Sequence, residues 1–479
     1  MATLQAADPF GNAITVQQPG SVEAVHSFIR GFLGYTPEIL AVLPAAEVDN
    51  SLMVQACAAA LCMFGESPAG PPQARVYLER ARRAALPATA REQLFANAVA
   101  SWVEGDVGAA LASHATLAAQ HPRDLAAIKL GQYHAFNLGD APTLLKLALP
   151  ALAAAPEVAT VHGLAAFGWE QCHLLDAAEA AARQALAMQA DEPWAQHALA
   201  HVLLTEGRLT EGEAFLQQAS GGWSGLTSFM RTHNWWHLAL FHIELGDAPA
   251  ALRLYDSQVW GVNPDYSQDQ VGAVSLLARL ELAGVAAGAV AVGAVAAVDV
   301  AAGDVAAGDV VVDDRWQALA AHLAPRVHDQ VQPFLDLQYL YGLARAGRPE
   351  ADALLAAITA YAPQAPPAQH AAWQQVAVPA AVGLLAHARG HWAQAADALT
   401  QALPRLALIG GSHAQRDLFE QLHVDALARS GQWAAVQQLL QPRANGQPQS
   451  QRLQRRLQQA YAALGLPAPS ATPAAMPRS

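Results

Sequence analysis

The chain has 479 residues, of which 53% are hydrophobic and only 14% charged, so its composition excludes disorder over most of its length. Ala and Leu dominate the composition, which favours helices. The net charge of −13 argues against a nucleic-acid partner, because phosphate contacts need clustered Lys and Arg. The sequence also lacks a basic amphipathic stretch for a membrane surface and a run of roughly 20 apolar residues for a membrane span.

The cysteines and the first residues of the chain favour a cytoplasmic protein. Cys57, Cys62 and Cys172 have no paired spacing, which is typical of reduced thiols packed in an apolar core. The first residues lack the charged and apolar segments of a secretory signal. We therefore expect cytoplasmic localisation, with no membrane and no nucleic acid as partner.

Residues 1–20 contain Pro9, Gly11 and Pro19 and are expected to form an extended arm. Helical periodicity begins near Val22, is interrupted by a loop at residues 65–72, and continues as a repeat to residue 282. Residues 283–314 are a Gly/Ala/Val segment without helical or strand periodicity and are predicted to be a low-complexity insert. Weaker helical repeats follow over residues 315–466, and residues 467–479 form a Pro-rich tail predicted to be disordered.

The repeat is marked by glycine turns at a nearly constant spacing. Gly105 and Gly139 lie 34 residues apart, Gly139 and Gly207 lie twice 34 residues apart, and the intermediate turn falls at His173. Each glycine can end one helix in the left-handed conformation, and the Asp that often follows can cap the next helix. A period of 34 with small residues at packing positions is typical of tetratricopeptide repeats. We predict an all-α solenoid of stacked helical hairpins whose C-terminal third approaches a concave groove.

Several longer strings of the chain are distinctive, namely Arg91-Glu92, Trp102 to Asp106, His121 to Lys129, Phe167 to Glu170, the segments around His197/His201 and His233/His237, and Gly410 to Asp417. Together these strings resemble those of the tetratricopeptide repeat protein 38 family. The resemblance covers nearly the whole chain outside the insert and the tail, and it implies the same solenoid fold without naming an activity.

The chain differs from this family at several polar positions. Members of the family tend to have His-Asp, Glu, Asp, Asn and His at the positions that hold Gln132-Tyr133, Leu204, Gly272, Leu335 and Gln338 here. The resemblance therefore implies a site of histidines and carboxylates that is remodelled in this chain. The polar residues that it retains are Glu170, His197, His201, His233, His237 and Asp336.

Two histidine pairs are the strongest candidates for a functional site. His197 and His201, and likewise His233 and His237, are four residues apart, so each pair shares one face of a helix. Because the pairs precede successive turns by similar offsets, we expect them on the same side of adjacent helices, with Glu170 on the preceding helix. Four imidazoles and a carboxylate suit Zn²⁺ or another divalent metal.

Two interpretations of the histidine pairs do not require a metal. The histidines could simply pack the groove, since the gap between His197 and His201 lacks the Glu of metalloproteases. Alternatively, a histidine oriented by Glu170 or Asp336 could act as a general base. The sequence contains no nucleophile elbow, phosphate loop or dinucleotide fingerprint that would name a reaction.

Aromatic and basic residues complete the candidate site. Trp235 and Trp236 point about 100° apart on a helix, so one packs in the core and the other, Trp236, is a candidate to face the groove. Ser412 and Gln415 fit a capping box. Arg416, in the first turn that follows, could reach a carboxylate in the groove, although a structural salt bridge is the expected role.

The sequence thus predicts a binding or scaffold protein that holds a small organic ligand or a peptide or protein in a His/Trp-lined groove. The predicted ligand-binding residues are Glu170, His197, His201, His233, Trp236, His237, Asp336 and Arg416. Two alternatives remain. One is an enzyme of unspecified reaction, with or without a metal at the four histidines. The other is a purely structural subunit.

Overall fold

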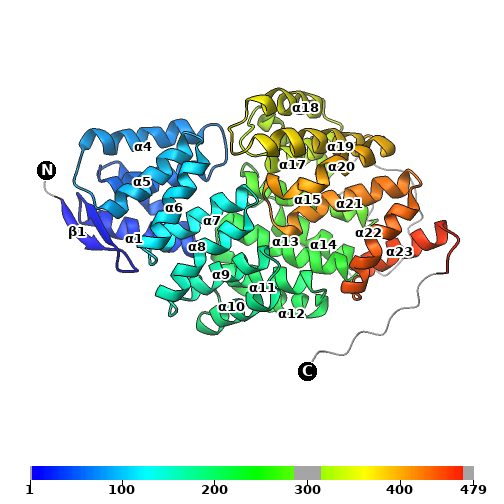
Figure 1. Ribbon diagram of the computed structural model, residues 1–479, viewed down its shortest axis with the longest axis horizontal. Coiled ribbons are helices and arrows are strands. Elements are labelled where there is room, and N and C mark those ends of the chain that lie inside the picture. The colour runs from blue at the N-terminus through cyan, green and yellow to red at the C-terminus, as the bar shows by residue number, and fades with distance from the viewer. Residues whose placement is uncertain (1–2, 285–313, 468–479) are drawn as a thin grey trace.

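The computed structural model describes residues 3–284 and 314–467, and it is an all-α solenoid with one small β-hairpin at its N-terminal end (Figure 1). The predicted fold class is therefore confirmed. The predicted insert at 283–314 and the tail at 467–479 lie almost entirely outside the described residues. Among the described helices, none is both long and apolar enough to cross a membrane.

The N-terminal half comprises the hairpin and fifteen α-helices. The hairpin strands are β1 (Leu4–Ala7) and β2 (Ala13–Val16), and the helices are α1 (Gly20–Gly34), α2 (Val42–Ala46), α3 (Leu52–Met63), α4 (Gly70–Ala84), α5 (Ala90–Val103), α6 (Val107–Gln120), α7 (Leu125–Asn137), α8 (Ala141–Ala154), α9 (Ala159–Gln171), α10 (Leu175–Met188), α11 (Pro193–Thr205), α12 (Leu209–Ala219), α13 (Ser228–Glu244), α14 (Ala248–Leu254) and α15 (Ser267–Leu282). Short turns of other helix types are η1 (Pro37–Ala41), η2 (Ser220–Gly225) and the π-helical η3 (Tyr255–Val259).

The C-terminal half continues the stack of helices. Its α-helices are α16 (Asp314–Leu323), α17 (Pro333–Arg345), α18 (Glu350–Tyr361), α19 (Val378–Ala388), α20 (Trp392–Ala402), α21 (His413–Arg429), α22 (Trp433–Gly446) and α23 (Gln451–Ala463). The shorter segments are η4 (Ala324–Arg326), η5 (Ala362–Gln364), the π-helical η6 (Ala372–Ala377) and η7 (Leu403–Ile409).

The turns follow the 34-residue spacing of the sequence. Gly105, Gly139 and Gly207 end α5, α7 and α11 with φ of 80°, 69° and 70°, and His173 takes the same left-handed conformation at φ 58° after α9. Asp106 then caps α6 by accepting a hydrogen bond from the Ala109 amide at 2.9 Å. Each helix pair is therefore a closed hairpin, as the period predicts.

Residues 3–20 form more than the extended arm that we expected. Strands β1 and β2 pair antiparallel, with Leu4 opposite Val16. Ile14 and Val16 are fully buried, and β2 lies against α3. The hairpin therefore belongs to the N-terminal core, which an alternation this short did not reveal in the sequence.

The C-terminal helices fold back against the N-terminal repeats, so the solenoid closes on itself. Figure 1 shows α21–α23 beside α13 and α14, and the Gln447 side chain donates to the Leu204 carbonyl at 3.1 Å. Arg452 donates to Glu244 at 2.7 Å, and His413 contacts the carbonyl oxygen of Gln171 at 3.1 Å. The expected approach of the C-terminal third to the groove is thus what the structure shows.

The two halves pack tightly against each other at the turn after α7. A Cβ atom at Gly139 would overlap the carbonyl oxygen of Ala407, whereas a Cβ at Gly105 would meet nothing within 4 Å. Both glycines have positive φ, so alanine is strained at both positions, but only Gly139→Ala also pushes η7 away. We expect Gly139→Ala to lower the free energy of unfolding by about 1–3 kcal/mol more than Gly105→Ala. Urea unfolding of the two variants measures this difference, and equal losses would show that this contact contributes nothing.

Candidate functional site

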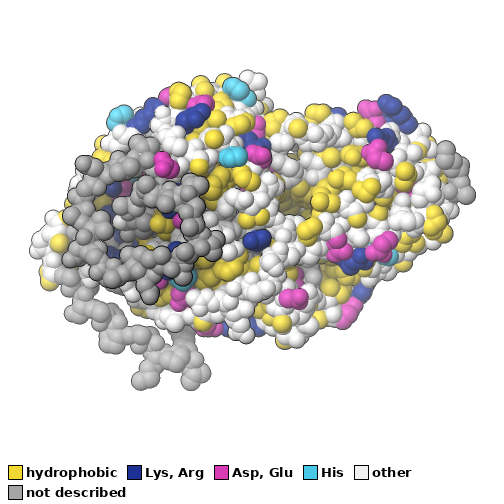
Figure 2. Space-filling view, turned by 180° about the vertical axis from the view of Figure 1, so that it is seen from behind, with side chains coloured by type: hydrophobic (Ala, Val, Ile, Leu, Met, Phe, Trp, Pro, Cys, Tyr) yellow, Lys and Arg dark blue, Asp and Glu magenta, His cyan; other side chains and the backbone are white. Residues whose placement is uncertain are grey.

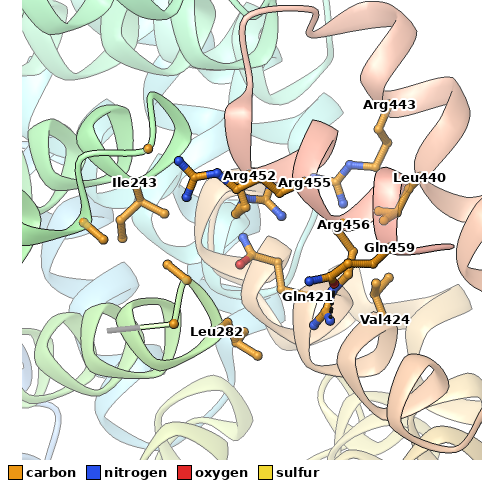
Figure 3. Close-up of a pocket in the computed structure, with 14 residues that line it drawn as sticks. Ile243, Leu282, Gln421, Val424, Leu440, Arg443, Arg452, Arg455, Arg456 and Gln459 are labelled. Atoms are coloured by element: carbon orange, nitrogen blue, oxygen red, sulfur yellow. Dashed lines mark hydrogen bonds between the residues drawn. The ribbon is translucent and has the colours of Figure 1, made fainter. Parts of the chain in front are cut away.

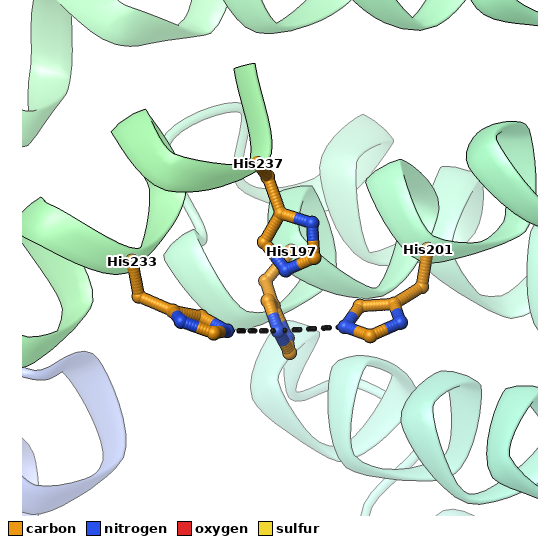
Figure 4. Close-up of side chains that lie close together, drawn as sticks. All are labelled: His197, His201, His233 and His237. Atoms are coloured by element: carbon orange, nitrogen blue, oxygen red, sulfur yellow. Dashed lines mark hydrogen bonds between the residues drawn. The ribbon is translucent and has the colours of Figure 1, made fainter. Parts of the chain in front are cut away.

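The four histidines of the sequence motif meet at one point between α11 and α13 (Figure 4). One ring nitrogen from each histidine lies within 4.8 Å of those of the other three. The Nε2 of His197 lies 3.1 Å from the Nε2 of His233 and 3.1 Å from that of His201. The ring of His237 stands 4.5 Å from that of His201, measured between centroids. The predicted convergence of the two pairs is therefore what the structure shows.

Hydrogen bonding alone leaves this cluster poorly satisfied. A single Nε2 carries either one hydrogen or one lone pair, so the Nε2 of His197 cannot make two good hydrogen bonds at once. Both ring nitrogens of His237 and the Nδ1 of His197 are buried and have no hydrogen-bond partner among the described residues. Such groups ordinarily cost stability, because they lose water without gaining a partner.

Burial disfavours the charged form of three of these imidazoles, those of His197, His233 and His237. Loss of solvation, assisted by the neighbouring histidines, lowers the pKa of His197 and His237 well below the usual value. The same loss of solvation lowers the pKa of His233 to about 3. Neutral imidazoles keep a lone pair on one nitrogen, which is the form that binds a metal.

Glu170 lies behind the cluster on α9, where the sequence placed it. Its Oε1 is 3.6 Å from the Nδ1 of His201, and its Oε2 accepts a hydrogen bond from the Gln171 side chain at 2.5 Å. Burial raises the pKa of Glu170, but His201 and then His413 outweigh this effect and leave the pKa below the usual value. An ionised Glu170 orients His201 so that its Nε2 faces the other histidines.

Trp236 supports the cluster from the core side. Its ring stacks on His233 at 5.2 Å with an angle of 11° between the planes, and it is 1% exposed. The neighbouring Trp235 lies edge-on against Trp223 at 4.9 Å. Trp236 therefore holds a histidine in place and does not line the neighbouring cavity, whereas Trp194, stacked on His197 at 4.5 Å, is one of the aromatic residues that do.

A cavity of about 400 Å³ lies next to the histidines. Its walls come from α1, η1, α3, α7, α8, α9, α11 and α13, and from the residues that precede and begin α15 and α21. His197 and His233 line it, whereas His201 and His237 lie behind them. Nine aromatic side chains surround it: Phe32, Tyr35, Phe64, Tyr133, Phe136, Phe167, Trp194, Phe229 and Tyr266.

Glu66 is a polar residue of this wall that sequence reasoning missed. Its carboxylate accepts hydrogen bonds from Tyr133 at 2.8 Å, from Ser267 at 2.6 Å and from Gln268 at 2.6 Å. Burial raises its pKa despite these bonds. Glu66 has a φ of 47°, a backbone conformation that residues other than glycine rarely adopt. The loop at residues 65–72 was visible in the sequence, but nothing in it marked this glutamate.

Lys129 is the second polar residue of the wall that sequence reasoning missed. Its Nζ donates to the carbonyls of Phe32 at 2.5 Å and Leu33 at 3.0 Å, and it lies 3.5 Å from the centre of the Tyr35 ring. Burial lowers its pKa well below the usual value. Lys129 thus caps the C-terminal end of α1, and its Nζ is bound to backbone oxygens.

The predicted site residue Asp336 lies away from the histidines and from the cavity wall. Asp336 on α17 is fully buried, accepts a hydrogen bond from Gln330 at 3.3 Å, and has a pKa raised well above the usual value by burial. It is neither in the histidine cluster nor in the cavity wall, so it does not orient a histidine. The sequence could not separate it from the site because α17 has the same repeat pattern as the groove helices.

Arg416 hydrogen-bonds mainly to backbone, and the predicted carboxylate interaction is present only through the charges of Glu170 and Glu420. Its guanidinium donates to the carbonyls of Gly410 and Gly411 and to the Nδ1 of His413 at 3.1 Å. Ser412 and Gln415 form the predicted capping box at the start of α21. Arg416 therefore stiffens the loop whose Ser412 reaches the cavity.

A smaller cavity of about 210 Å³ lies between α15 and the C-terminal helices and is lined by four arginines (Figure 3). Arg443 pairs with Asp417, and Arg452 pairs with Glu244 at 2.7 Å. Burial raises the pKa of Asp417, but Arg443 and the arginines around it outweigh burial and hold the pKa far below the usual value. These charges compensate one another and join the two halves of the chain.

The geometry of the repeats decides the architecture. The chain is a solenoid of tetratricopeptide-like hairpins. No known protein family matches its sequence, so the resemblance to the tetratricopeptide repeat protein 38 family remains an expectation.

Similar solved structures share little sequence with the chain. One is the APC/C hetero-tetramer Cut9–Hcn1, with 13% identity and a TM-score of 0.39, covering 82% of this chain and 69% of that chain. Another is the human IFIT1 dimer with PPP-AAAA, with 13% identity and a TM-score of 0.39, covering 83% of this chain and 86% of that chain. At this level of similarity, neither structure identifies a ligand for this protein.

Proposed function

We propose that the protein is a helical-repeat binding protein that holds a small, mostly apolar organic molecule in the cavity beside the histidines. The observation that carries this proposal is the ring of nine aromatic side chains around a space of about 400 Å³. A few fixed polar groups among apolar walls are typical of small-molecule sites. Glu66, Gln268 and His233 supply such groups here.

A small molecule fits better than the peptide that we also considered. Peptides bound by helical repeats lie along an open concave surface. In this chain the C-terminal segments cover that surface, since Gly410 packs directly against Asn137 and Gln447 against Gly207. What is left is a cavity with walls on several sides.

The expectation that the protein binds no nucleic acid stays a prediction. One structural neighbour, IFIT1, is described with PPP-AAAA. Within the described cavity wall, Lys129 is the one Lys or Arg, and backbone carbonyls occupy it. On the face shown in Figure 2, Lys and Arg side chains are interspersed with Asp and Glu and do not form a single basic patch. These features disfavour a phosphate-rich ligand.

An enzyme is the second candidate, because two histidines of the cluster line the same cavity. Catalysis by a histidine base alone is the weaker form of this candidate. The pKa of His233, lowered to about 3 by burial, makes this imidazole a poor proton acceptor near neutral pH.

Binding of the neutral apolar dye Nile red tests the cavity. Phe229 lines it and stacks on His233 at 5.2 Å, whereas Phe215 on α12 is also partly buried but lies outside it. We expect one dye molecule per chain, and Phe229→Ala should raise its Kd by about tenfold through lost apolar contact. Fluorescence titration measures both values. Equal effects of Phe229→Ala and the matched control Phe215→Ala, or no binding by the unaltered protein, would contradict the proposal.

A further inference from the structure

The four clustered histidines have a geometry that packing does not explain. Their nitrogens converge from two helices, and the two Nε2···Nε2 contacts of His197 have to share a single hydrogen or a single lone pair. Two imidazole nitrogens bound to one tetrahedral ion at about 2.0 Å stand roughly 3.3 Å apart. The two Nε2···Nε2 distances of 3.1 Å are close to this value.

The structure assigns a binding site for one borderline divalent transition-metal ion, of the Zn²⁺ class, to His197, His201, His233 and His237. The donors are four nitrogens and no oxygen, which suits Zn²⁺, Co²⁺, Ni²⁺ or Cu²⁺ and disfavours Mg²⁺ and Ca²⁺. The site depends on the histidines alone and does not require the proposed cavity ligand.

The surroundings of the cluster fit this assignment. Both nitrogens of His237 are buried without a hydrogen-bond partner among the described residues, so one of them is available as a ligand. The carboxylate of Glu170 stands 3.6 Å from the Nδ1 of His201, which is the usual position of the residue that orients a metal-binding histidine. Trp236 and Trp194 stack on His233 and His197 and fix two of the rings.

The position of the cluster also places the proposed ion next to the cavity. His197 and His233 line the cavity, and His201 and His237 lie behind them. An ion held by all four would therefore border the apolar cavity, with its four tetrahedral positions filled by imidazole nitrogens.

Another pair of buried histidines provides a matched control. His114 and His134 lie 5.5 Å apart between ring centroids, are buried, and have ring nitrogens without partners among the described residues. This pair provides two histidines where the proposed site has four, and it lies outside the four-histidine cluster. Their substitution disturbs packing to a similar degree without removing a proposed ligand.

The test is titration of the chelator-treated full chain with Zn²⁺ and Co²⁺, measured by elemental analysis and by the visible absorption of bound Co²⁺. We expect one ion per chain and the intense absorption of four-coordinate Co²⁺. His237→Asn should weaken binding by at least about 100-fold, Glu170→Gln by about 10–100-fold, and His134→Asn not at all.

Each outcome decides the assignment. Binding of less than one ion per chain would overturn it, as would binding that persists in His237→Asn or that falls equally in His134→Asn. Circular dichroism shows whether each variant folds. If His237→Asn does not fold, unchanged affinity and an unchanged Co²⁺ spectrum in Glu170→Gln would overturn the assignment. Nile red binding by the metal-free protein is measured separately, so failure of the metal site and failure of the cavity proposal are distinguishable.

Discussion

Replacing Arg91 by Met should lower the free energy of unfolding by about 3–5 kcal/mol, because it leaves a buried carboxylate without its partner. The Nη1 of Arg91 lies 2.5 Å from Asp124, and the exposed fractions of the two side chains are 4% and 2%. Its Nη2 also donates to the carbonyl of Ala13 at 2.9 Å. The substitution therefore breaks the link between α5, α7 and the N-terminal hairpin. Urea unfolding at neutral pH measures the loss.

The matched control for this experiment is Arg75→Met. Arg75 pairs with Glu104 at 2.7 Å, but the side chains are 46% and 61% exposed. Exposed pairs contribute about 0–1 kcal/mol, so this variant should remain close to the unaltered protein. Similar losses in both variants would mean that the buried pair has no special importance.

Asp425→Asn should lower the free energy of unfolding by about 3 kcal/mol at neutral pH. Asp425 on α21 is 3% exposed and accepts hydrogen bonds from Arg429 at 2.7 Å, from His387 at 3.2 Å and from Arg456. It thus joins α19, α21 and α23. Asn keeps the shape but not the charge, so these partners lose their counterion.

The effect of Asp425→Asn should depend on pH. Burial alone would raise the pKa of Asp425, but the hydrogen bond from His387 and the charges of Arg456 and Arg429 hold the pKa far below the usual value. Because the pKa is lower in the folded than in the unfolded chain, this contribution is present in full above about pH 4 and is lost as the pH falls further. The difference in unfolding free energy between the two proteins should therefore shrink in acid.

An exposed aspartate serves as the control for this pH dependence. Asp352 pairs with Arg389, and its side chain is 59% exposed. Asp352→Asn should change stability by less than about 1 kcal/mol. A gap between Asp425→Asn and the unaltered protein that grows in acid would contradict the proposed role of the ionised carboxylate.

The fold could be predicted from the sequence because its signal is local and repeated. Gly105, Gly139 and Gly207 mark turns by their spacing, and even His173 takes the left-handed conformation that this spacing requires. The β-hairpin was missed because two strands of four residues give too short an alternation. The strings that carry the family resemblance include Arg91 and Asp124, and the structure shows that these residues form a buried ion pair.

The site was predicted only in part, for a related reason. Residues four apart on a helix share a face, so the two histidine pairs and Glu170 could be placed together. Glu66 and Lys129 reach the cavity from distant segments through chain closure, and no periodicity encodes that closure. Conversely, Asp336 follows the repeat pattern but lies on a helix that closure does not bring to the histidines.

The closure of the solenoid also bears on when the protein can first hold a ligand. The cavity is bounded by Phe32 near one end of the described chain and by Ser412 and Gln415 near the other. We expect the cavity of a nascent chain to stay open on one side until residue 415 has been translated and has docked. The ligand that we propose would then load only after most of the chain has left the ribosome, and a prematurely terminated chain would lack the closed cavity.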